Sequence, residues 1–149
     1  MEYKELYAKA YALAKERHNG QKRWDGSDYF STHLVRVSQD AQKLAFYQYT
    51  KEIVSIVGLL HDIVEDTPTS IDEIYDKFGK VIGNSVKSMT HLPDEEYHRY
   101  IERLSVDTYA ILVKLADLNH NLETVTGNKR KLYLMARSYL ELVLSNADF

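Results

Sequence analysis

The sequence of 149 residues contains no cysteine, so disulfide bridges and thiolate metal ligands are excluded. Any metal ion would have to be held by imidazole and carboxylate groups. No stretch approaches the ~18 consecutive apolar residues that a membrane-spanning helix needs, and the N-terminus lacks the basic-then-apolar order of a secretory signal. We therefore expect a cytoplasmic protein with no membrane partner.

The sequence also lacks an excess of basic residues: 19 lysines and arginines face 22 aspartates and glutamates, for a formal net charge of -3. A protein that holds long nucleic acid usually carries a basic excess, so we expect no such partner. A few local Lys and Arg residues can still dominate one cleft, and a small anionic ligand is compatible with this charge. No pattern in the sequence specifies an oligomeric state.

Only two prolines and six glycines interrupt the chain, and the runs between them carry apolar residues at helical spacing, with no convincing strand. A capping box of Ser70 and Glu73 marks one helix start, and Pro93 with the acids after it marks another. We predict an all-α fold of about seven or eight helices in a single domain, residues 1–149. The predicted helices cover residues 2–18, a segment beginning near 31–32, 51–64, 70–79, 80–89, 93–104, 106–122 and 129–144.

The strongest chemical signal is the adjacent pair His61 and Asp62 at the end of an otherwise apolar helix. Burying such an ionisable pair costs several kcal/mol unless each group is paired or bound to a metal ion. Imidazole and carboxylate together suit manganese, iron, zinc or a related divalent ion. Two adjacent side chains do not complete such a site, so further ligands must come from elsewhere in the chain.

Asp117 and His33 are the best further candidates. Asp117 is a polar residue in an apolar helix, and Lys114, Asp117 and Asn121 share one helix face because they are spaced i, i+3 and i+7. His33 lies at the start of its predicted helix. Two structural alternatives stay open at this point: Asp117 as a buried partner of Lys114, and His33 as a capping or core histidine.

Glu65 and Asp66 follow the His-Asp pair by about one helical turn. They could activate water or protonate a leaving group without touching the metal, and the alternative is a solvated helix end. The other four histidines are expected to have structural roles: His18, His91, His98 and His120.

Four motifs stand in one order along the chain: residues 18–23 (His-Asn-Gly-Gln-Lys-Arg), 26–33 (Gly-Ser-Asp-Tyr-Phe-Ser-Thr-His), 59–67 around His61, and 113–122 around Asp117. Together they resemble the HD superfamily of metal-dependent phosphohydrolases. They are most similar to the small alarmone hydrolases, the stand-alone relatives of the hydrolase domain of RelA/SpoT-type enzymes. The resemblance covers nearly the whole chain.

The resemblance implies a role for each candidate residue. One divalent ion, usually manganese, would be held by His33, His61, Asp62 and Asp117. Glu65 and Asp66 would position and activate the attacking water. The implied substrate contacts are Arg23 on the nucleobase with Lys22 beside it, Asn121 at the ribose and phosphate end, Tyr133 as an aromatic lining residue, and Lys114 on the face it shares with Asn121.

The implied reaction removes the 3′-pyrophosphate from (p)ppGpp and returns GDP or GTP. The alternatives are an HD phosphohydrolase acting on an adenine alarmone, a nucleoside 5′-monophosphate or NADPH, and a nucleotide-binding module without catalysis. The sequence departs from the family pattern at Leu34, Leu118 and Asn119. We expect the last two to lie near the pocket and to affect substrate preference. The length leaves no room for a synthetase domain.

Overall fold

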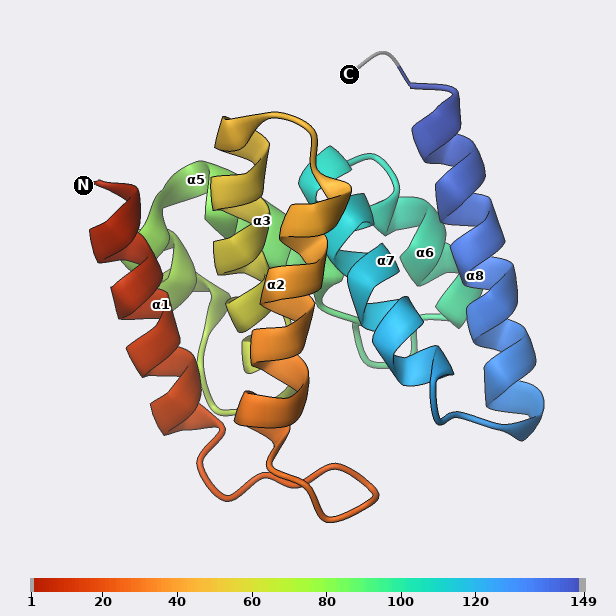
Figure 1. Ribbon diagram of the computed structural model, residues 1–149, viewed down its shortest axis with the longest axis horizontal. Coiled ribbons are helices and arrows are strands. Elements are labelled where there is room, and N and C mark those ends of the chain that lie inside the picture. The colour runs from red at the N-terminus through yellow and green to blue at the C-terminus, as the bar shows by residue number, and fades with distance from the viewer. Residues whose placement is uncertain (1, 148–149) are drawn as a thin grey trace.

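The computed structural model describes residues 2–147, and these residues form helices with one isolated β-bridge, between Lys22 and Asp28. The all-α prediction is confirmed (Figure 1). No helix in the described part of the chain has the length and apolar character needed to cross a bilayer. The elements are α1 (Tyr3–Arg17), the π-helical segment η1 (Phe30–Leu34), α2 (Val35–Leu44), α3 (Gln48–Leu60), α4 (Ile63–Asp66), α5 (Ile71–Met89), α6 (Tyr97–Leu104), α7 (Thr108–Leu122) and α8 (Gly127–Ser145).

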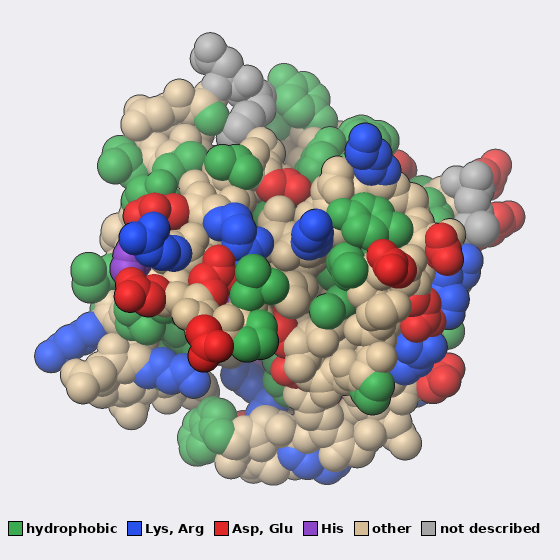
Figure 2. All heavy atoms as spheres, turned by 180° about the vertical axis from the view of Figure 1, so that it is seen from behind, with side chains coloured by type: hydrophobic (Ala, Val, Ile, Leu, Met, Phe, Trp, Pro, Cys, Tyr) green, Lys and Arg blue, Asp and Glu red, His purple; other side chains and the backbone are tan. Residues whose placement is uncertain are grey.

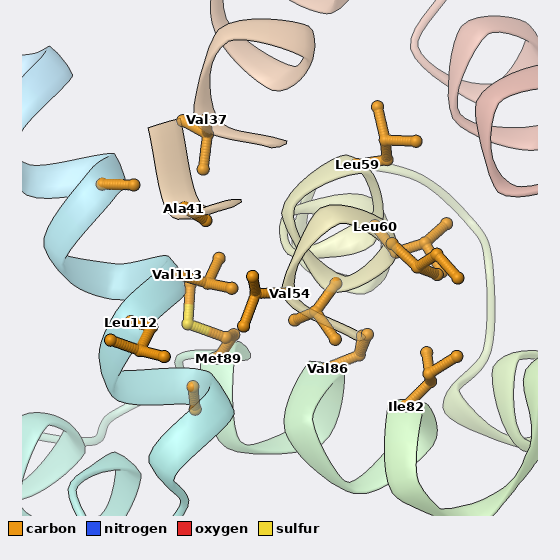
Figure 3. Close-up of a cluster of buried hydrophobic side chains, with 14 of the residues drawn as sticks. Val37, Ala41, Val54, Leu59, Leu60, Ile82, Val86, Met89, Leu112 and Val113 are labelled. Carbon is orange, nitrogen blue, oxygen red and sulfur yellow. The ribbon is translucent and has the colours of Figure 1, made fainter. Parts of the chain in front are cut away.

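Helix α3 lies at the centre of the hydrophobic core. Every residue of its second half is buried, and it packs against α1, α2, α5 and α7. In Figure 3, Val54 of α3 lies near Ala41 of α2, Met89 of α5 and Val113 of α7. Helix α8 packs on the outer side of α7 and touches α6 (Figure 1). The end of α3 is therefore held from several sides, which matters because the predicted His-Asp pair follows it.

The crossing of α2 and α3 depends on a residue without a side chain. A Cβ atom on Gly58 would lie 2.7 Å from the Cα atom of Ser38. The Ser38 hydroxyl donates a hydrogen bond of 2.6 Å to the carbonyl of Ser55, so the two helices are joined at this crossing. Because the clash would be with backbone, a larger residue could be accommodated only if the helices separated.

Two predicted helix boundaries are wrong. The helix predicted for 51–64 ends at Leu60, and a turn precedes α4. The helix predicted from Pro93 begins only at Tyr97, because Asp94 adopts a left-handed conformation (φ 63°) that interrupts helical geometry. The carboxylate of Glu95 does not lie in the first turn of a helix, where it was predicted; it forms an ion pair with Arg103 at 2.8 Å.

The other predicted boundaries agree with the structure to within a few residues. Ser70 accepts a hydrogen bond from the backbone N–H of Glu73, as half of the predicted capping box requires. The Glu73 carboxylate binds Arg17 of α1 instead of completing the box. Gly79 ends the first part of α5 with φ 86°, which confirms the break predicted there.

We expect Gly58→Ala to lower the free energy of unfolding by about 1–3 kcal/mol, because the added methyl group forces α2 and α3 apart. Denaturant unfolding measures this change. Gln48→Ala, a substitution at an exposed position of the same helix α3, is the control and should leave the midpoint nearly unchanged. Equal midpoints for Gly58→Ala and the unsubstituted protein would contradict the close crossing.

Candidate functional site

Four predicted ligands from three places in the chain lie close together. His33 comes from η1, His61 and Asp62 from the turn between α3 and α4, and Asp117 from the middle of α7. His33 Nε2 lies 3.0 Å from Asp117 Oδ1 and 3.9 Å from Asp62 Oδ2. His61 Nε2 lies 3.1 Å from Asp62 Oδ2 and 3.5 Å from Asp117 Oδ1. The structure thus brings together two imidazole nitrogens and two carboxylate oxygens.

Local irregularities of the helices aim these side chains. Consecutive residues of a regular helix point about 100° apart, but α3 ends at Leu60 and Asp62 has the non-helical angles φ -103° and ψ 1°. His61 and Asp62 can therefore face the same point. His33 sits in a π-helical segment, a widened turn that often occurs at functional sites.

His61 has the features of a prepared metal ligand. Its Nδ1 lies 2.7 Å from the carbonyl oxygen of Gly58 and must donate to it, because a carbonyl can only accept. Its Nε2 is buried and has no hydrogen-bond partner among residues 2–147, although two carboxylates are close. Donor atoms of His33, His61 and Asp62 all lie within 4.8 Å of one another. This arrangement fits a divalent cation held by nitrogen and oxygen.

The charges of the cluster also suit a cation. Burial would lower the pKa of His61, but the carboxylates of Asp62 and Asp117 outweigh it and raise that pKa well above its ordinary value. Burial would raise the pKa of Asp62, but His61 outweighs it and holds the pKa at about 2. A bound divalent cation would take the place of the proton that His61 otherwise attracts, with both carboxylates already ionised as coordination requires.

Asp117 serves two partners with its two oxygens. Burial would raise its pKa, but the nearby ammonium of Lys114 outweighs it and lowers the pKa of Asp117 well below its ordinary value. Lys114 Nζ donates to Oδ2 at 3.0 Å and lies over the ring of Tyr100 at 5.1 Å. Oδ1 faces the histidines and also accepts from Asn121 at 3.1 Å. The structure therefore shows Asp117 as a buried partner of Lys114, and this pairing leaves Oδ1 facing the histidines.

The two predicted acids lie beside the cluster. Glu65 and Asp66 line a small cavity of about 200 Å³, together with Asp62, Lys114 and Asp117. Burial raises the pKa of Glu65, and burial together with the charge of Asp62 raises the pKa of Asp66. A raised pKa brings a carboxyl group closer to the range in which it exchanges protons near neutrality. The pair is thus placed to handle water and protons at this cavity.

A larger cavity of about 650 Å³ adjoins the small one. Both cavities are lined by Tyr29, Asn121 and Tyr133, which form their common wall. The predicted substrate contacts divide between them: Lys22 and Arg23 line the large cavity, and Lys114 lines the small one. On the face seen in Figure 2, basic and acidic side chains are interspersed.

Sequence reasoning missed three residues of this region. Tyr29 donates a hydrogen bond to Asp62 Oδ2. Trp24, an exposed indole, lines the large cavity. His120 was expected to be structural, but its Nδ1 lies 2.8 Å from Nδ1 of His33. Its spacing of three residues after Asp117 was the one available signal, since that spacing puts both on one helix face.

Leu118 and Asn119 do not lie where they were expected. Leu118 is fully buried in the core, and the Asn119 side chain accepts a hydrogen bond from Arg137 of α8 at 3.0 Å. Neither residue lines the small or the large cavity. The two residues therefore contribute to the core packing of α7 and to its contact with α8, and neither contacts the two cavities.

An all-α fold with a buried histidine–aspartate cluster defines a class of helical domains built to hold a divalent cation. A family model described as "HD domain" matches residues 10–142, and the chain belongs to this family.

Two curated relatives have names that describe alarmone metabolism. The chain is 33% identical over 146 residues to a guanosine-3′,5′-bis(diphosphate) 3′-pyrophosphohydrolase of Spiroplasma citri, a match that covers 90% of this chain and 19% of the relative. It is 34% identical over 146 residues to the bifunctional (p)ppGpp synthase/hydrolase SpoT of Escherichia coli K12, with 89% of this chain and 20% of the relative covered. The chain thus spans about a fifth of the length of these relatives.

A solved structure confirms the fold. It is described as a metazoan ortholog of SpoT that hydrolyzes ppGpp and plays a role in starvation responses. The two chains superpose with a TM-score of 0.74 at 23% sequence identity, over 96% of this chain and 87% of that one.

We expect a divalent cation to raise the melting temperature of the chelator-treated protein. At a concentration ~100 times the dissociation constant, the binding stabilises the folded state by about 2.7 kcal/mol, which corresponds to several degrees for a chain of this size. Differential scanning calorimetry with Mn²⁺ measures the shift. His61→Ala should lose it, whereas His98→Ala, an exposed histidine beside Glu96, should keep it. An undiminished shift in His61→Ala would overturn the assignment of the cluster.

Proposed function

We propose that this chain is a metal-dependent hydrolase that removes the 3′-pyrophosphate from guanosine alarmones and returns GDP or GTP with pyrophosphate. The observation that carries the proposal is the common wall of the two cavities. It sets a space lined by cationic side chains directly beside the histidine–aspartate cluster and the acid pair. The names of the relatives support the same substrate class.

In the proposed mechanism, His33, His61, Asp62 and Asp117 hold one Mn²⁺ ion. When bound, such an ion lowers the pKa of water and offsets the negative charge of a phosphate group. Tyr29 keeps Asp62 in place through its hydrogen bond to Oδ2. The second oxygen of Asp117 stays engaged by Lys114, so the carboxylate cannot rotate away from the cluster.

Glu65 and Asp66 are the proposed proton-handling pair. Glu65 is anchored by the backbone N–H of His91, and Asp66 by the side-chain amide of Gln21 at 3.0 Å. The raised pKa of each carboxyl suits a group that takes a proton from water or returns one to the departing 3′-oxygen. Lys114, which lines the same small cavity, is the proposed contact for the pyrophosphate group.

The nucleoside is proposed to lie in the large cavity. Arg23 offers a planar guanidinium that can stack on a purine, and Lys22 lies beside it. Trp24 adds an aromatic face, and stacking of a base on an aromatic side chain contributes ~1–3 kcal/mol. Asn121 and Tyr133 line both cavities and are proposed to contact the ribose between them.

Product analysis tests the proposed reaction. We expect the protein with Mn²⁺ to convert ppGpp to GDP and pyrophosphate, with no product after chelation. Release of orthophosphate alone, or turnover only of an adenine alarmone, a nucleoside 5′-monophosphate or NADPH, would assign the site to another nucleotide. Tight binding of ppGpp without any product would identify a nucleotide-binding module. The cytoplasmic location, the single domain and the absence of a long nucleic-acid partner stay predictions.

We expect Glu65→Gln and Asp66→Asn each to lower kcat by roughly 100-fold or more, in line with the usual contribution of general acid–base catalysis. Both variants should keep the thermal stabilisation by Mn²⁺, because neither carboxylate is a proposed ligand. Asp72→Asn, which removes an exposed acid from the first turn of α5, is the control and should leave turnover unchanged. Unchanged turnover in both acid variants would exclude the pair from the mechanism.

Trp24 provides a direct reading of nucleoside binding, because it is the single tryptophan of the sequence. We expect ppGpp to quench its fluorescence in the Glu65→Gln variant, which holds the nucleotide without turning it over. Inorganic pyrophosphate has no base to stack and should leave the emission unchanged. Equal quenching by both compounds would show that the indole does not report on the base.

A further inference from the structure

Four side chains form a continuous series of hydrogen bonds from the large cavity to the histidine–aspartate cluster. Arg23 Nη1 lies 3.1 Å from His120 Nε2. His120 Nδ1 lies 2.8 Å from His33 Nδ1, and the two rings are stacked with centroids 5.0 Å apart. His33 Nε2 lies 3.0 Å from Asp117 Oδ1. His120 is buried and uses both ring nitrogens, so its orientation is fixed at both ends.

We propose that His120 is a positioning residue that couples occupancy of the metal site to the position of the Arg23 guanidinium in the large cavity. The inference rests on the metal site proposed above, but it does not depend on which nucleotide is the substrate. In the arrangement seen here, Arg23 is hydrogen-bonded to His120 of α7, and Nε2 of His33 donates a hydrogen bond to Asp117. Binding of a cation by His33 exchanges the donors and acceptors in this series of hydrogen bonds and releases Arg23 from His120.

The direction of the hydrogen bonds in this series follows from which groups can donate and which can accept. A guanidinium has no acceptor, so Arg23 donates to His120 Nε2, which carries a lone pair. The proton of the neutral His120 ring is then on Nδ1 and is donated to His33 Nδ1. His33 in turn has its proton on Nε2, which donates to Asp117 Oδ1. With that proton in place, the ring nitrogen that faces the cluster has no lone pair to offer a cation.

Metal binding requires the opposite direction. A neutral histidine that coordinates through Nε2 carries its proton on Nδ1 and donates it to a neighbouring acceptor. The acceptor here is His120 Nδ1, so the proton of His120 has to move to Nε2. That N–H then points at Arg23, which is also a donor, and the contact of 3.1 Å is lost. Each ring has only moved its proton from one nitrogen to the other, and neither has changed its charge.

The released guanidinium can move within the large cavity. Arg23 already lines this cavity, and among the described residues its other amino group is hydrogen-bonded to the side chain of Asn121 alone, at 3.1 Å. The coupling therefore makes Arg23 available to an anionic or aromatic ligand once the cation is bound. Coupling of this kind is reciprocal, so a ligand that draws Arg23 into the cavity must strengthen cation binding by the same factor.

The state of the His120 ring can be observed directly. In long-range ¹H–¹⁵N spectra of the full chain with labelled histidine, we expect His120 Nε2 to be an unprotonated nitrogen in the chelated protein. Zn²⁺, a diamagnetic probe, should convert it to an N–H nitrogen. Zn²⁺ binding at His61 with an unchanged His120 ring would overturn the coupling. Absence of any Zn²⁺ effect at His33 and His61 would instead overturn the metal site itself.

Affinity for Zn²⁺ without nucleotide gives an independent test by isothermal titration calorimetry. We expect Arg23→Ala to bind Zn²⁺ roughly tenfold more tightly, the factor that corresponds to one hydrogen bond of about 1.4 kcal/mol. Lys22→Ala is the matched control, because it removes a positive charge from the same loop without touching His120. A merely structural role of Arg23 predicts weaker binding, and a gain no larger than that of Lys22→Ala would refute the coupling.

A double substitution assigns the effect to His120. His120→Phe keeps a planar ring of similar size but can neither accept nor donate a hydrogen bond. In that background, Arg23→Ala should therefore increase the affinity for Zn²⁺ no more than Lys22→Ala does. A gain as large as in the unsubstituted background would overturn the role of His120. If His120→Phe does not fold, the spectra of the unsubstituted protein still decide between the two outcomes.

Discussion

The buried carboxylate of Asp117 is the charge around which the site is organised. An ionised carboxylate inside an apolar helix is costly unless hydrogen bonds and opposite charges surround it. Lys114 and Asn121 of its own helix meet part of this need, at 3.0 and 3.1 Å. His33 and His61, from other elements, face the remaining oxygen. Asp117 therefore requires η1 and the end of α3 to converge on α7, and the cluster and the core are held by the same packing.

His61 and Asp62 reach the cluster because helix α3 ends at Leu60 and a turn follows it. Helix α3 is locked in the core and crosses α2 at the backbone contact of Gly58. The carbonyl of the same glycine orients His61 by accepting its Nδ1–H at 2.7 Å. A single residue thus sets both the spacing of two helices and the tautomer of His61. Because both functions belong to the backbone, the orientation of His61 depends directly on the helix crossing.

Hydrophobic periodicity was enough to predict the all-α fold and most helix boundaries. The polar residues in apolar segments gave the four clustered side chains as candidates, and the family resemblance joined them into one set. The sequence could not locate the break after Leu60 or the left-handed Asp94, because neither position carries a glycine, the residue that usually marks such a break. Spacing along α7 relates Asp117 to His120, but it says nothing about His33 or Arg23, which approach from the chain between α1 and α2. A contact between segments that are distant in the sequence produces no periodic pattern in either segment.

The loop before η1 is consistent with the proposed coupling between the metal site and the large cavity, because this loop holds the backbone of Arg23. The Arg23 N–H donates to the Ser27 carbonyl at 2.9 Å, and the Gly26 N–H donates to the Arg23 carbonyl at 2.9 Å. With the backbone of Arg23 held by its own loop, only its side chain is free to change partner. His120 lies on α7, a helix packed against α2, α3, α5 and α8. In the proposed coupling, a change confined to two ring protons and one guanidinium connects the proposed metal ligands with the cavity proposed for the nucleoside.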